Sequence, residues 1–150
     1  MNRKCTRRTL AVLLIIGVVG FAPHAMAAKE RSNEIASASV AFEDGQVVPD
    51  LEHNIIKFRS LEIMIGDPDA KKNKQTVKLK MKIENFGEHD HKVIVTTTLR
   101  DKNDKIVAIK TVKNDIDDND SEVFNAKFGL SPDDVARIET VVLEVSYLKD

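Results

Sequence analysis

The chain has 150 residues, of which 42% are hydrophobic and 31% are charged, with a formal net charge of −1. A domain of about 120 residues is large enough to be held together by a hydrophobic core alone. Cys5 is the only cysteine, so an internal disulfide and a cysteine-ligated metal cluster are excluded.

The first 27 residues have the three parts of a secretory signal peptide. Basic residues at positions 3, 4, 7 and 8 precede an uncharged apolar run from Leu10 to Phe21, and Ala25-Met26-Ala27 supplies a small-residue cleavage site. The run has about 12 residues, short of the roughly 20 that cross a bilayer as a helix. We therefore expect a mature protein that begins at Ala28, is periplasmic or secreted, and has no permanent membrane anchor.

The export route is left open by the same segment. Thr6-Arg7-Arg8-Thr9-Leu10 resembles the twin-arginine signature, which implies folding before transport. The strongly apolar run, and the absence of a basic residue between Phe21 and Ala27, favour the general secretory route instead. Cys5 precedes the apolar run, so it cannot be the acylated first residue of a mature lipoprotein.

Four of the 23 basic residues lie in the signal peptide and all 24 acidic residues follow it, so the mature chain has a net charge of −5. Its basic residues concentrate between Lys71 and Lys82, where no aromatic residue is interleaved. Nucleic-acid surfaces combine basic residues with stacking aromatics. We interpret these lysines as a solvated strand face and expect no nucleic-acid partner.

Residues 28–37 are small and polar and predict a flexible leader, and residues 38–150 predict one β-sandwich domain. Apolar residues alternate with polar ones in four segments, as in strands with one buried face. The alternating positions are Val77, Leu79, Met81 and Ile83; Val93, Val95, Thr97 and Leu99; Phe124, Ala126 and Phe128; and Val141, Leu143, Val145 and Tyr147.

Three further strands complete the prediction. One contains Val107, Ile109 and Thr111, one runs from Ser39 to Phe42, and a long one runs from Ile56 to Ile65 with a β-bulge near Ser60. The acidic stretch from Asn114 to Asp120 predicts a connection. Ser131-Pro132-Asp133-Asp134 predicts a short helical turn before the last strand. The fold class is therefore an all-β, immunoglobulin-like antiparallel sandwich of about seven strands.

The stretch from Lys82 to Phe128 resembles the FxLYD type of exported bacterial β-sandwich. The resemblance is carried by Ile83-Glu84-Asn85, Thr97-Thr98-Leu99-Arg100-Asp101 and Ile106-Val107. Leu99 and Asp101 match the family pattern, whereas Thr97 stands where phenylalanine is expected and Arg100 where tyrosine is expected. The resemblance implies an extracytoplasmic accessory module without an assigned active site.

Two polar segments are candidate metal sites. In Glu88-His89-Asp90-His91, alternate residues can share a face, so His89 and His91 could bind one zinc, copper or nickel ion. Asp115, Asp117 and Asp120 lie in an acidic stretch that could bind calcium, although the EF-hand pattern fails because Asp120 replaces its glycine. The alternative for both segments is a solvated polar turn, and we expect no cofactor beyond a weakly bound divalent metal.

No phosphate-binding glycine loop, Gly-x-Ser-x-Gly elbow or His-Glu-x-x-His motif occurs in the chain, so we expect no enzymatic activity. The sequence favours a non-catalytic exported β-sandwich that binds or scaffolds another envelope macromolecule, with an envelope or extracellular protein as the expected partner. A sheet face or a free edge strand would make the contact. The alternative is a periplasmic metal-binding accessory protein that uses the His89 and His91 loop.

Overall fold

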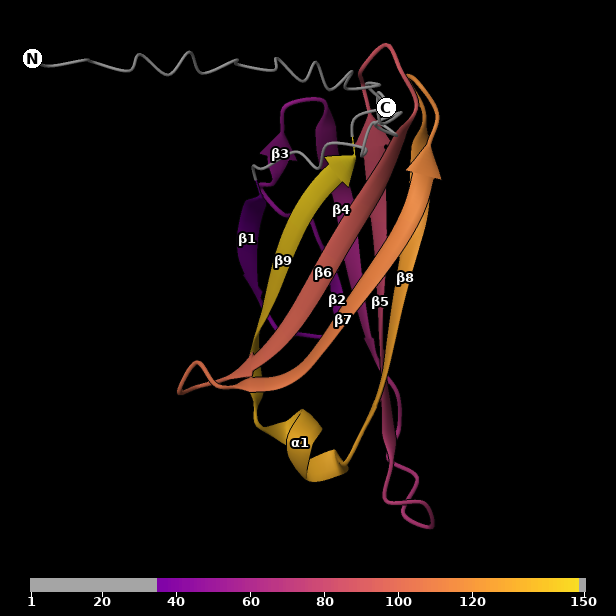
Figure 1. The fold of residues 1–150 in the computed structure, drawn as a ribbon. Helices are drawn as coiled ribbons and strands as arrows, with labels where there is room; N and C mark the ends of the chain where they lie inside the picture. The colour runs from indigo at the N-terminus through magenta and orange to yellow at the C-terminus, as the bar shows by residue number, and fades with distance from the viewer. Residues whose placement is uncertain (1–34, 149–150) are drawn as a thin grey trace, which may run out of the picture.

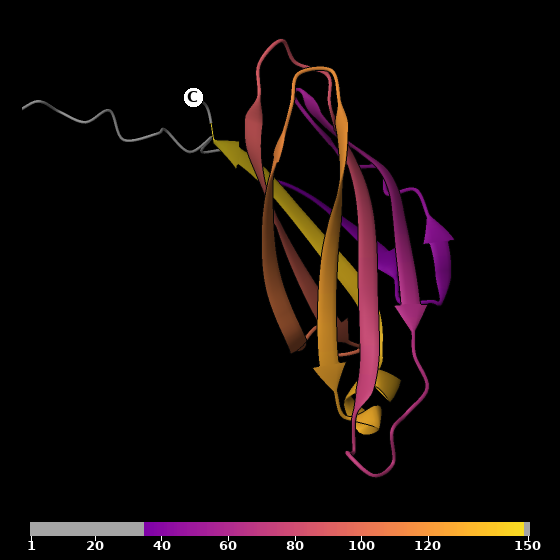
Figure 2. The same ribbon diagram turned by 90° about the vertical axis from the view of Figure 1, so that its right-hand side faces the viewer.

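The computed structural model describes residues 35–148, which fold as two packed antiparallel β-sheets (Figures 1 and 2). The predicted signal peptide and leader residues 28–34 lie outside the described part. No helix within residues 35–148 is long and apolar enough to span a bilayer. The elements are, in chain order, β1 (Ala36–Ala41), β2 (Gly45–Val47), β3 (Glu52–His53), β4 (Ile56–Ile65), β5 (Gln75–Asn85), β6 (His91–Asp101), β7 (Ile106–Ile116), β8 (Ser121–Leu130), α1 (Pro132–Ala136) and β9 (Ile138–Leu148).

The first sheet has the strand order β1-β9-β6-β7 and the second has the order β2-β4-β5-β8, with β3 paired to β4. Their inner faces enclose a continuous apolar core, in which Phe58, Leu79, Leu99 and Leu143 are at most 1% exposed. Burial of such side chains is the main favourable term in folding, and it removes the need for a disulfide.

The strand order is that of an immunoglobulin-like sandwich with one permutation. Strands β4, β5 and β8 occupy the positions of strands A, B and E, and β7, β6 and β9 occupy those of C′, C and F. The place of strand G beside F is taken by β1, which pairs antiparallel with β9 although it is the first of the described strands. The predicted fold class is therefore confirmed, and the N-terminal strand completes a sheet that the C-terminal strand usually completes.

Several local predictions are also confirmed. The alternating residues of β5, β6, β8 and β9 point inward. The pairing of β4 with β5 shifts register between Phe58 and Ser60, which is the predicted bulge. Ser131 caps α1, because its hydroxyl accepts from the backbone amide of Asp134 at 3.1 Å.

Other boundaries differ from the prediction. The described residues contain nine strands instead of about seven, because β2 and β3 are too short to show a period. β1 begins at Ala36, so the last two residues of the predicted leader belong to a strand. β7 continues to Ile116 through the start of the predicted acidic connection, because residues 114–116 complete the ladder with β6. Backbone pairing and the buried side chain of Ile116 outweigh the low strand propensity of Asn and Asp here.

Candidate functional site

The outer face of the second sheet carries a row of lysines from β5 and β8. Residues with even numbers in β5 point away from the core, which places Lys78, Lys80 and Lys82 on one line. Strand β8 pairs with β5 so that Lys127 lies directly opposite Lys78. Lys74, just before β5, joins the same face, and we call these five residues the lysine surface.

The lysine surface has an excess of positive charge along the middle of the sheet. No residue of β5 before Glu84, and no residue of β8 after Glu122, is acidic. None of the five ammonium groups makes an ion pair within 4 Å among the described residues, whereas Lys72 pairs with Asp69 at 3.4 Å. Carboxylates approach this surface from the side formed by β4 and its neighbouring loops, where Glu62 is the register partner of Lys80 and Asp44, Asp67 and Asp69 line the same hollows as the lysines.

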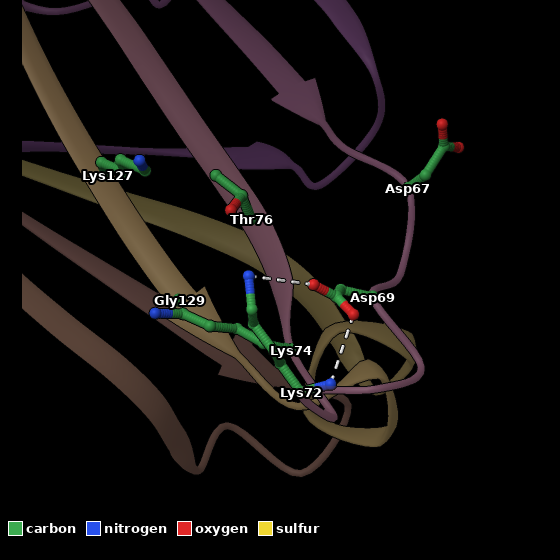
Figure 3. A pocket seen from close by; sticks show the side chains of 7 residues that line it. All are labelled: Asp67, Asp69, Lys72, Lys74, Thr76, Lys127 and Gly129. Atoms are coloured by element: carbon green, nitrogen blue, oxygen red, sulfur yellow. Dashed lines mark hydrogen bonds and ion pairs between the residues drawn. The ribbon is translucent and has the colours of Figure 1, made fainter.

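The position of Lys74 depends on a glycine. Its side chain lies over Gly129 of β8, where a Cβ added to the glycine would come within 2.2 Å of the lysine Cε (Figure 3). Thr76 is the register partner of Gly129. The missing side chain of Gly129 therefore leaves a recess beside Thr76, and the ammonium of Lys74 fills it.

The surface is hollowed along its length. Two hollows of about 430 and 470 Å³ share Thr76 and Lys127, and one of about 300 Å³ continues past Lys80 and Lys82. None of the residues that line these three hollows is aromatic. The three hollows together follow the line of β5.

The predicted histidine pair does not share one face. His91 is 8% exposed, with its ring centroid 5.1 Å from that of Tyr147 and its Nδ1 atom 3.4 Å from the carbonyl oxygen of Leu148. His89 is exposed in the preceding loop. His53 contacts Tyr147 as well, at 5.6 Å between centroids. Sequence spacing missed this His53, Tyr147 and His91 cluster, because β3 is distant in the chain.

The acidic residues occupy different structural positions. Asp115 lies in β7 and faces Lys92 across the sheet at 3.5 Å, while Asp117 and Asp120 form the turn before β8. No group of three or more His, Cys, Asp or Glu side chains suited to a metal ion occurs within residues 35–148. The metal sites therefore stay predictions without support from a preformed set of ligands.

Asn85 holds the two loops at this end of the sandwich together. Its side-chain amide donates to the carbonyl oxygens of His89 (2.8 Å), Ile116 (3.2 Å) and Asp117 (3.1 Å). Its side-chain oxygen accepts from the backbone amide of Gly87 at 3.0 Å. The sequence resemblance pointed to Asn85 only as part of a turn, and its structural role accounts for this residue without a ligand.

Comparison with known proteins adds little to this description. No family model matches the chain, and no curated protein matches it significantly. A solved structure described as a putative β-galactosidase from Bacteroides fragilis is similar, with 18% identity and a TM-score of 0.42. The match covers 47% of this chain and only 10% of that one.

Proposed function

We propose that the protein is an exported, non-catalytic module that binds an anionic macromolecule of the cell envelope through the lysine surface. Export is the expectation from the signal-peptide pattern of residues 1–27. The sandwich acts as a rigid support, and the lysines of β5 and β8 supply the contact. Neither a nucleophile nor a metal ion is needed for this function.

One observation carries the proposal. Lys78 and Lys127 lie directly opposite each other on adjacent strands, where like charges destabilise a sheet. Lys80, on the same face of β5, follows two residues later. Because the mature chain has more acidic than basic residues, an acidic residue in place of Lys78 or Lys127 would have been available and would make the fold more stable. The concentration of unpaired cations is therefore more consistent with a binding role than with solvation alone.

Chromatography on immobilised heparin, used as a generic polyanion, tests this proposal. The purified protein should be retained at low salt, and the double variant Lys78→Glu/Lys127→Glu should elute at a clearly lower salt concentration. The control Lys102→Glu/Lys113→Glu makes the same charge change in the β6–β7 turn and on β7, and it should behave like the parent. Equal loss in both variants would show that only net charge matters. No retention of the parent would leave the lysines as a solvated face.

A further inference from the structure

The cations of the lysine surface form four successive rows across the sheet. Lys80 and Lys82 each supply one row, and the opposed pair of Lys78 and Lys127 supplies another. The fourth row contains the register partners Thr76 and Gly129, neither of which is charged. The side chain of Lys74 lies over Gly129 and so places an ammonium in this row. The rows are two residues apart along β5, so they repeat every ~6.8 Å and extend over about 20 Å.

This repeat restricts the chemistry of a ligand chain. Two residues of polypeptide contain six backbone bonds and span about 7 Å when extended. A phosphodiester chain whose phosphates are linked through three carbons also has six bonds per repeat. An extended polymer of this kind therefore places one phosphate at each lysine row, without stretching or looping.

The arrangement of charges also favours a polyol phosphate over an acidic peptide. Every unpaired cation on the surface is an ammonium, which binds phosphate as a point charge. Successive side chains of an extended peptide point to opposite faces, so only half of its carboxylates could reach the lysine rows. The one arginine on this face, Arg59, is engaged by Glu84. No aromatic residue lines the hollows, so the surface has no platform for nucleic-acid bases.

We infer that the ligand of the lysine surface is a linear polyol phosphate, which lies along β5 with one phosphodiester at each of the four rows. This inference rests on the proposed function, because it names the chemical class of the anionic partner. The protein would recognise the polymer by the distance between its phosphates, and the affinity of the complex would fall steeply as the salt concentration rises.

Calorimetry with oligo(glycerol phosphate) of two to eight repeats tests the inference on the purified protein. Affinity should rise with each phosphate up to four and then change little, with a slope of log K against log salt near −3, from about −0.7 for each of four phosphates. Poly-L-glutamate of equal charge should bind at least tenfold more weakly. In Gly129→Ala the displaced Lys74 should shift the plateau from four phosphates to three.

The possible failures are distinguishable. Equal binding of polyglutamate, or an affinity independent of length, would overturn the phosphodiester assignment while leaving an anion-binding module. Tighter binding of oligothymidylate with the same number of phosphates would assign the surface to nucleic acid. If no polyanion binds, the proposed function fails together with this inference. A Gly129→Ala variant with an unchanged plateau would remove Lys74 from the set of rows.

Discussion

The side-chain amide of Asn85 donates to the backbone carbonyl of Asp117 at 3.1 Å, and so joins the loop after β5 to the turn before β8. These segments cross between the two sheets at the same end of the molecule. Asn85 is fully buried, and the same amide also donates to the carbonyls of His89 and Ile116. One side chain thus bonds to backbone groups of two segments, the loop after β5 and the chain at Ile116 and Asp117.

Asn85→Ala should destabilise the domain by roughly 2–3 kcal/mol, because a fully buried side chain would be removed together with the hydrogen bonds that it makes to both loops. Urea denaturation monitored by circular dichroism measures this change. The control Asn125→Ala removes an exposed asparagine from β8 and should change the free energy of unfolding by less than about 0.5 kcal/mol. Equal effects of the two substitutions would contradict the bridging role of Asn85.

The strand faces could be predicted from the sequence because burial imposes a period of two on each strand. The phase slip at Ser60 predicted a bulge for the same reason, and the Ser131 cap followed from local hydrogen-bond chemistry. The lysine surface could be predicted only in part. The period places Lys78 and Lys80 on one wet face, but Lys127 and Gly129 join them through the pairing of β5 with β8, which composition does not reveal.

Leu79→Asp should unfold the domain, because Leu79 is fully buried and an unpaired buried carboxylate costs several kcal/mol, a large part of a small domain's stability. Leu143→Asp should have the same effect from the other sheet. Lys80→Asp changes the adjacent, exposed position and should be mild. Circular dichroism melts that rank Lys80→Asp as more damaging than Leu79→Asp would reverse the assigned faces of β5.

Lys78→Glu should stabilise the fold, by about 0.2–1 kcal/mol, because it replaces a repulsive cross-strand pair with an attractive one opposite Lys127. Denaturation at low and high salt measures the gain, which should shrink as salt screens the pair. Lys113→Glu, on exposed β7 opposite the uncharged Ile94, provides the matched control and should show no such gain. A loss of stability in Lys78→Glu would contradict the repulsion on which the proposed function depends.

The two histidines near β6 should respond differently to substitution. His91→Ala removes a buried ring packed against Tyr147 and should cost about 1–3 kcal/mol, while His89→Ala should be nearly neutral. Calorimetry with zinc or copper should show no binding tighter than about a millimolar dissociation constant. Micromolar binding that is lost in both histidine variants would instead favour a metal-binding accessory protein.

Asp101 should stabilise the β6–β7 turn in a pH-dependent way. Its carboxylate accepts from the backbone amides of Lys105 at 3.0 Å and Asn103 at 2.8 Å. The bond from Lys105, above all, lowers the pKa of Asp101 below its ordinary value of 3.8. The folded state therefore favours the ionised form, and the resulting stability is fully present above that value and is lost as the pH falls through the lower, folded-state pKa.

The difference in melting temperature between the parent and Asp101→Ala should consequently be constant near neutral pH and should shrink below about pH 4. Lys102→Ala changes the next residue of the same turn without removing a carboxylate, and its effect should not follow this profile. Melts recorded from about pH 7 to about pH 2.5 test this profile, because the range spans the ordinary titration of an aspartate carboxyl group. A difference that grows on acidification would mean that the turn stabilises the protonated form of Asp101. That result would contradict the two hydrogen bonds that its carboxylate accepts from backbone amides.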